Sequence, residues 1–314
     1  MSDLSIIDWL LSSGNSIDTK EIPSLALWKH LFFQLTSNVQ NTADMAIAGG
    51  FISDRPAYAF SAGYWSALYC LIPSLPGKTI TAMCVTEKDG NHPKAIKSEL
   101  SSKNQNGETI WLINGSKKFV TGANEAEVLL IAASAGTSES GQNKIRLIRV
   151  NNHIPGITIK PLKDLPFIPE ISHGELEINN VQITESQILP GDGYANYIKP
   201  FRTLEDIHVT AAILGYLLRI AFLFNWPQST KEQVLALLTG IKTIALSNPL
   251  QSVVHIILSG VSGMFSSFLN SIDLYWKLTD DKTRSQWERD KALLNIAGNA
   301  REKRLSTAWS QYES

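Results

Sequence analysis

Apolar residues recur at helical spacing in the first part of the chain. They form stripes over residues 6–11, 25–35, 44–49 and 58–71, which polar or proline-containing segments separate. Spacings of three and four residues place such side chains on one side of a helix. The pattern therefore predicts an N-terminal helical domain over residues 1–79.

The pattern changes between residues 80 and 193. Apolar and polar residues alternate over residues 108–113, 144–150 and 174–178, with Asn, Gly and Pro between these segments. Alternation with a period of two is typical of strands that bury one face. The pair Asn114-Gly115 is a common hairpin signal and predicts that the chain turns there between two strands. We expect an antiparallel β domain, either a barrel or a sandwich, and favour the β-barrel.

Helical spacing returns after the linker Pro190-Gly191-Asp192-Gly193. The pattern predicts helices over residues 204–224, 231–247, 250–278 and 285–309. Helices, a middle β domain and a C-terminal helical bundle over residues 194–314 give an α+β fold class.

Composition excludes several classes of function. The 314 residues carry 28 Lys and Arg against 29 Asp and Glu, so no excess of positive charge favours nucleic acid or an anionic membrane. Cys70 and Cys84 lack metal-site spacing and fit a reducing compartment. The first residues, Met1 to Ser5, lack the features of a signal peptide. We therefore expect a cytoplasmic protein with no metal site.

Residues 245–272 test that expectation because they carry no formal charge and are long enough to cross a bilayer. They also contain Asn248, Pro249, His255 and several serines, and they lack basic flanks. We interpret the segment as a helix buried within the bundle, with Pro249 near its first turn. A membrane-associated helical protein remains the alternative.

Two short segments, Cys84-Val85-Thr86-Glu87 and Asn114-Gly115-Ser116-Lys117-Lys118-Phe119-Val120-Thr121, resemble the middle domain of the acyl-CoA dehydrogenases. The order of predicted domains is similar too. The resemblance implies an FAD-dependent oxidoreductase that converts an acyl-CoA to its α,β-unsaturated form. It also implies an electron acceptor such as an electron-transfer flavoprotein, a role in fatty acid metabolism, and a homo-oligomer.

The resemblance assigns flavin contacts to four residues of these segments. Val85 and Thr86 match the backbone and hydroxyl positions that face the pyrimidine side of the flavin ring. Phe119 matches the aromatic residue that stacks near the ring, and Thr121 matches the hydroxyl near N5. Taken singly, each is also consistent with an ordinary strand threonine or a core aromatic residue.

The family places its catalytic base at one of two positions. The position near the C-terminus corresponds to Gly298, so that base is missing. The other matches Glu205, ten residues before Gly215, and a carboxylate there would remove the α-proton of the acyl group. Glu205 and Asp206 are also acids that the first turn of a helix favours, and Asp206 stands where the family has Arg.

Other departures support an alternative function. The segment Thr86–Pro93 is one residue shorter than the family's pyrophosphate loop and lacks its serine, for which Asn91 or His92 would have to substitute. Residues 225–230 lack the family's motif that reaches the FAD of a neighbouring subunit. These differences favour a non-catalytic relative that binds an acyl thioester or a protein partner without flavin. We interpret Arg301–Arg304 as a solvated helix face.

Overall fold

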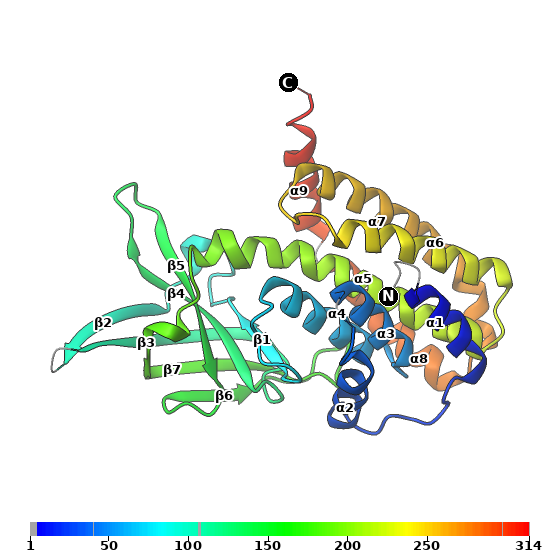
Figure 1. Ribbon diagram of the computed structural model, residues 1–314, viewed down its shortest axis with the longest axis horizontal. Coiled ribbons are helices and arrows are strands. Elements are labelled where there is room, and N and C mark those ends of the chain that lie inside the picture. The colour runs from blue at the N-terminus through cyan, green and yellow to red at the C-terminus, as the bar shows by residue number, and fades with distance from the viewer. Residues whose placement is uncertain (1–4, 40, 106–107, 297, 314) are drawn as a thin grey trace. The chain divides into compact units, whose positions relative to one another are not determined.

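The computed structural model describes residues 5–39, 41–105, 108–296 and 298–313 (Figure 1). Residues 1–4, on which the expectation of no signal peptide rests, lie outside them. The described residues form two compact units. The helical unit comprises those within 1–73, 166–170 and 202–314, and the sheet unit comprises those within 74–165 and 171–201. The division into three domains at residues 79 and 193 stays a prediction.

Helices build the helical unit. Their bounds are α1 Ser5–Ser13, α2 Leu25–Thr36, α3 Thr42–Ile52, α4 Pro56–Leu71, α5 Lys199–Leu223, α6 Gln228–Ala245, α7 Ser252–Ile272, α8 Asp281–Asp290 and α9 Gly298–Trp309. Side-chain caps fix several starting points. Ser24 accepts a hydrogen bond from the amide of Leu27 at the start of α2, and Asn41 accepts two at the start of α3.

Glycines allow α3 and α5 to cross closely. A Cβ atom on Gly50 would lie 1.9 Å from the carbonyl oxygen of Ala212, and one on Gly215 would lie 2.4 Å from that of Ile47. Any side chain at these positions would force the two backbones apart. This crossing fixes the position of α5, the helix that carries Glu205.

The helix predicted at the C-terminal end of the chain is interrupted in the structure. The helix expected over residues 285–309 is two helices, α8 and α9, joined by a short 3₁₀ segment, Lys291–Asn295. Trp287 of α8 stacks on Trp276 with ring centroids 4.8 Å apart, and both indoles are buried. This aromatic pair anchors α8 through apolar burial.

The uncharged segment also differs from its prediction. The helix α7 begins at Ser252, so Pro249 lies three residues before its first residue. The interpretation as a helix buried within the bundle was wrong, because only 28% of the most apolar 18-residue window of residues 252–278 is buried. Within the part of the chain that the structure describes, two helical stretches, residues 194–223 and 252–278, could cross a membrane by length and composition alone, and 78% of the most apolar window of the first is buried.

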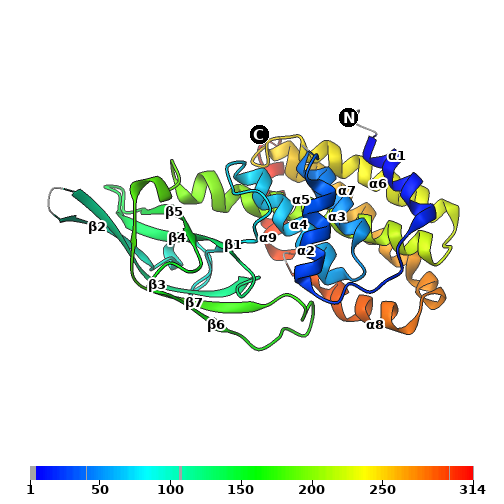
Figure 2. The same cartoon turned by 60° about the horizontal axis from the view of Figure 1, so that its bottom comes forward.

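The sheet unit contains one curled sheet (Figure 2). Its strands are β1 Thr81–Cys84, β2 Glu99–Gln105, β3 Glu108–Thr121, β4 Val128–Thr137, β5 Asn143–Asn151, β6 Ile157–Pro161 and β7 His173–Ile183. They follow the order β1-β4-β2-β3-β7-β6, and β5 pairs with β4. Most pairs are antiparallel as expected, whereas β4 pairs in parallel with β1 and β2.

The predicted turn at Asn114-Gly115 is wrong, because β3 continues through both residues. The glycine is still required there. Gly115 has φ +147°, and a Cβ atom on it would lie 2.3 Å from the hydroxyl of Ser98. The pairing with β7 shifts register at this point, and the side chain of Asn114 accepts a hydrogen bond from the amide of Asn180. The local signal therefore marked a β-bulge and not a hairpin.

Candidate functional site

The two motif segments meet in the sheet unit at a buried ion pair. Lys117 Nζ lies 2.5 Å from Glu87 Oε1, and the lysine side chain is fully buried. The same carboxylate accepts hydrogen bonds from the amides of Lys97 and Ser98 and from the Ser98 hydroxyl, at 2.8–3.0 Å. Close to the pair, the amide of Lys118 donates to the carbonyl oxygen of Thr86 at 2.8 Å. These bonds hold Thr86 and the end of β3 together.

The hydrogen bonds determine the charge of Glu87. Burial opposes ionisation, but the contact with Lys117 and the two backbone amides outweigh it and lower the pKa of Glu87. A carboxylate with this many donors stabilises a buried ammonium group. We therefore describe the contact as an ammonium–carboxylate pair.

A β-bulge directly after Lys117 exposes Phe119. Lys117 is paired with Leu176 and Val120 with Gly174, so two residues of β3 lie opposite the single residue Glu175. Phe119 has φ +55° and its side chain is 61% exposed. A left-handed backbone at a bulky residue is costly and persists only where its surroundings impose it. Bulges often redirect a side chain next to a functional site.

The threonines predicted to contact flavin lie on either side of this bulge. Thr86 is half-buried and is tied to the bulge through Lys118, whereas Val85 is buried. Thr121 is half-buried and lies two residues after Phe119. The structure thus brings Thr86 and the bulge together and keeps Thr121 at the end of the same strand.

His173 is a site residue that sequence reasoning missed. Its Nε2 lies 3.4 Å from Thr121 Oγ1, and its Nδ1 lies 3.1 Å from the carbonyl oxygen of Ile171. A carbonyl oxygen can only accept, so Nδ1 carries the proton, and the neutral ring then accepts at Nε2. Burial lowers the pKa of His173, which favours this neutral form. Only the β3–β7 register, which pairs Thr121 with His173, reveals the contact.

The segment that replaces the pyrophosphate loop closes on itself. Glu87 and Gly90 exchange two backbone hydrogen bonds of 2.9 and 3.0 Å. His92 Nδ1 accepts from the amide of Lys94 and caps a short 3₁₀ helix. The tight turn and the capping role give His92 a local structural function.

The residues around Phe119 fit one part of a flavin cofactor. A flavin ring is flat and has polar edges. The sheet unit offers it the exposed side chain of Phe119, the hydroxyl groups of Thr86 and Thr121, and free space above Gly122. The shortened turn offers no serine to a pyrophosphate. The residues therefore fit the ring end of the cofactor better than its nucleotide end.

Glu205 lies on α5 in the helical unit, where it is half-buried. Burial, assisted by the adjacent charge of Asp206, raises its pKa to about 7, although Arg301, Arg304 and Arg202 oppose the shift. A general base is most effective when its pKa lies near the working pH. Its neighbour His208 is no partner for it. The ring nitrogens of His208 contact the Leu204 carbonyl oxygen at 2.7 Å and the Thr42 hydroxyl at 2.9 Å.

Asp206 forms an ion-pair cluster with α9. One carboxylate oxygen accepts hydrogen bonds from Nε and Nη2 of Arg301, at 3.0 and 2.8 Å, and the other contacts Arg304. Arg301 also donates to the carbonyl oxygen of Leu294 at 2.8 Å. The interpretation of 301–304 as a solvated face is therefore wrong for both arginines, which are partly buried. They balance the negative charge that Asp206 introduces where the family has Arg.

The Arg289-Asp290 pair has a structural role. Asp290 is 1% exposed and accepts a hydrogen bond of 2.7 Å from the amide of Ile168, while Arg289 binds Glu170 and Asp290. This network attaches residues 166–170 to α8. The position expected for a C-terminal base, Gly298, lies at the start of α9. Among the described residues, no cluster of three or more His, Cys, Asp or Glu side chains could hold a metal ion.

The motif segments and the bulge lie in a region that is similar to a known protein family. The family model described as "Acyl-CoA dehydrogenase, middle domain" matches residues 82–181, which include both motif segments and the bulge. By its middle part, residues 82–181, the chain is similar to the acyl-CoA dehydrogenase family. A glutaryl-CoA dehydrogenase of Desulfococcus multivorans is 31% identical over 134 residues, 42% of this chain and 32% of that relative. The chain spans about a third of the length of the curated relatives it matches.

Solved structures extend the likeness to the rest of the chain. Butyryl-CoA dehydrogenase from Megasphaera elsdenii has a TM-score of 0.72 at 16% identity and covers 100% of this chain and 99% of its own. The FAD complex of PigA has a TM-score of 0.66 at 16% identity, with 98% and 95% covered. These structures confirm the α+β fold expected for an acyl-CoA dehydrogenase.

Proposed function

We propose that this protein is an FAD-dependent enzyme that oxidises an acyl-CoA to the α,β-unsaturated acyl-CoA. The bulge that exposes Phe119 supports the proposal most directly. It combines the residue types of the flavin motif with a strained backbone held by a buried ion pair, and such strain is common at functional sites. The FAD complex of the structurally similar PigA supports the choice of cofactor.

Each predicted residue has a defined task in this proposal. When bound, flavin would supply the acceptor for the β-hydrogen of the acyl group, which leaves as hydride. Val85 and Thr86 would hold one edge of the ring, and Phe119 would contact its surface. Thr121 donates its own proton toward His173, so its hydroxyl oxygen is set to accept a hydrogen bond from an N–H group.

Glu205 would act as the general base. In its ionised form the carboxylate takes the α-proton of the acyl group, a step that needs a pKa close to that of the working solution. Because Glu205 must be deprotonated to act, turnover should rise as the pH increases through about 7.

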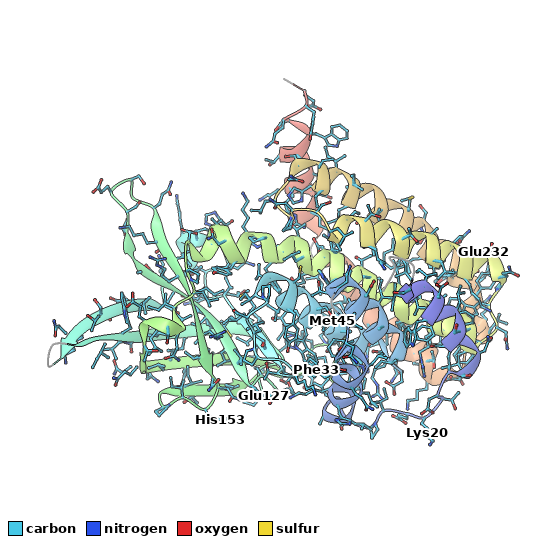
Figure 3. The ribbon with its side chains drawn as sticks, viewed as in Figure 1. Lys20, Phe33, Met45, Glu127, His153 and Glu232 are labelled. Atoms are coloured by element: carbon cyan, nitrogen blue, oxygen red, sulfur yellow. The ribbon has the colours of Figure 1, made fainter. Side chains whose placement is uncertain are left out.

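The colour of the purified protein and one substitution test this function. We expect a yellow protein, or one that becomes yellow on addition of FAD, whose flavin is bleached anaerobically by acyl-CoA. Glu205→Gln should retain flavin but slow the bleaching by roughly two to four orders of magnitude. The matched control is Glu232→Gln, an exposed glutamate on α6 that is labelled in Figure 3. Full activity of Glu205→Gln would remove this residue from the mechanism.

A non-catalytic relative is the second candidate function. Gly298 at the position of the family's usual base and the shortened turn after Thr86 favour it. This candidate predicts a colourless protein that ignores added FAD yet binds an acyl thioester or a protein partner. A titration with FAD, followed by flavin fluorescence, separates the two.

We also propose that the chain forms a homo-oligomer through α7. Val253, Ile257 and Met264 lie on one side of this helix and are 42%, 50% and 57% exposed. A continuous apolar face is typical of a protein contact. The variant Ile257→Glu should then reduce the molar mass measured by light scattering, and an unchanged mass would exclude this face.

The proposal has four further parts. We propose that the protein is cytoplasmic, does not bind membranes, and acts in fatty acid metabolism. We also propose that an electron-transfer flavoprotein accepts its electrons. The near-neutral charge balance is compatible with the first two. Reoxidation of the reduced protein by an added electron-transfer flavoprotein, compared with air, would test the acceptor.

A further inference from the structure

The helical unit contains a cavity formed by α1, α2, α3, α5 and the segment between α1 and α2. Its volume is about 600 Å³, within the range of small-molecule sites. The walls are largely apolar, and two cationic side chains line it, Arg219 of α5 and Lys20. The principal lining residues are Trp9, Ile17, Leu31, Leu35, Phe51 and Arg219.

Arg219 is unusual because it is buried and has little neutralising contact. It is 6% exposed, and its Nη2 donates to the carbonyl oxygen of Asp18 at 2.5 Å. Burial lowers the pKa of Arg219, and the negative charges of Asp54 and Asp18 only oppose this shift. Within the described residues no carboxylate makes an ion pair with this guanidinium group.

The two nearby carboxylates are committed elsewhere. Asp54 accepts hydrogen bonds from Nε and Nη2 of Arg55, at 2.9 and 2.8 Å, and from the amide of Ile22 at 2.8 Å. The exposed carboxylate of Asp18 accepts from the amide of Lys20 at 2.9 Å. Lys20 also lines the cavity and is labelled in Figure 3 on the segment between α1 and α2.

A buried charge without a partner is costly, and a guanidinium group matches the geometry of a carboxylate, with which it forms paired hydrogen bonds. We propose that this cavity binds a small carboxylic acid with an apolar tail, whose carboxylate pairs with Arg219 and whose tail lies against Trp9, Leu31 and Leu35. The tail would bury apolar surface that the cavity leaves open to water.

This site is separate from Glu205 and does not depend on the proposed oxidation. Arg219 lies fourteen positions after Glu205 on α5, a rise of about 21 Å along the helix. The close contact of Gly50 and Gly215 with the opposing backbones lies between these two positions. A ligand at Arg219 is therefore a second ligand of the helical unit.

Calorimetry with the 314-residue chain tests the proposal, with octanoate as probe and octanamide as its neutral match. We expect octanoate to bind once per chain and at least about tenfold more tightly than octanamide, because only the carboxylate forms charged hydrogen bonds with Arg219. Equal affinity for the two probes, or no binding of octanoate, would overturn the proposal without any variant.

Two variants locate the site. Arg219→Met should reduce octanoate affinity to that of octanamide, and Leu35→Trp should block both probes while the arginine remains. Arg284→Met, an exposed arginine of α8, is the matched control and should change nothing. Thermal unfolding establishes that each variant is folded. Octanoate affinity that survives both Arg219→Met and Leu35→Trp would refute this location, whereas unchanged affinity in Glu205→Gln would separate it from the proposed active site.

Discussion

The two candidate site regions control their charges in different ways. In the sheet unit, Glu87 and Lys117 are buried, and the carboxylate accepts hydrogen bonds from two backbone amides and a hydroxyl. In the helical unit, the Asp206 cluster is completed by Arg301 and Arg304, whose side chains are 35% and 19% exposed. The first pair is part of the folded core, and the second remains within reach of water.

This difference suggests a division of tasks. Breaking a buried pair leaves an uncompensated charge in the interior, so the pair near Phe119 fixes geometry. A partly exposed cluster contributes little to stability but acts electrostatically on its neighbours, so the Asp206 cluster adjusts the pKa of Glu205. The sheet unit would thus position a cofactor, and the helical unit would adjust an acid.

The largest effect should come from Lys117→Met. Removing the ammonium group leaves the Glu87 carboxylate buried without its charge partner, which should lower the free energy of unfolding by about 3–5 kcal/mol. Urea unfolding at neutral pH measures the loss. Because the pair lies next to the bulge, flavin affinity should fall as well.

Lys118→Met is the control for that change. Its ammonium group lies 3.0 Å from Glu175, but the two side chains are 38% and 34% exposed, so the cost should stay below about 1 kcal/mol. Similar losses for the two variants would contradict the contrast between buried and exposed pairs. In Glu87→Gln/Lys117→Met, where no charge is left unpaired, part of the stability should return.

The second effect concerns Glu205 and depends on pH. Its pKa is raised by folding from 4.5 to about 7, so the folded state is not penalised below pH 4.5, loses stability as the pH rises from 4.5 to about 7, and carries the full penalty above that. Glu205→Gln removes this penalty. It should raise the free energy of unfolding by about 3 kcal/mol at pH 8 and leave it nearly unchanged at pH 4. Thermal unfolding at the two pH values measures the difference.

Glu232→Gln again serves as the control, because this glutamate is exposed on α6. An equal effect of Glu205→Gln at pH 4 and pH 8 would show that the substitution acts through packing and not through ionisation.

The sequence was sufficient for the overall fold because its periodic patterns are long. Helical spacing predicted α2, α4 and α5 close to their observed bounds, and alternation predicted parts of β3, β5 and β7. The positions at which a strand or a helix is interrupted were less predictable. Asn114-Gly115 has the composition of a turn, but tertiary pairing with β7 keeps the strand extended and turns the signal into a bulge.

The candidate site was predictable only where a local motif carries it. Phe119 and Thr121 follow from such a motif, although their contacts with a flavin stay predictions. The contact of His173 with Thr121 joins residues that are 52 positions apart, and the pairing of Arg301 with Asp206 joins residues that are 95 apart. Periodicity and charge counts contain no information about such long-range pairs, so the arginines of α9 were interpreted as solvated.

The smallest effects should come from the Asp206 cluster. The midpoint of the pH–rate profile should shift in opposite directions when a negative or a positive charge is removed. Asp206 raises the pKa of Glu205, and Arg304 lowers it. In Asp206→Asn the midpoint of the pH–rate profile should therefore move to lower pH, and in Arg304→Met it should move to higher pH. Stability should change by only about 1 kcal/mol in Arg304→Met, because this ion pair is partly exposed. Anaerobic reduction rates measured from pH 6 to pH 9 test both shifts, and added salt should diminish them. Shifts in the same direction for both variants would mean that packing, and not charge, sets the pKa of the base.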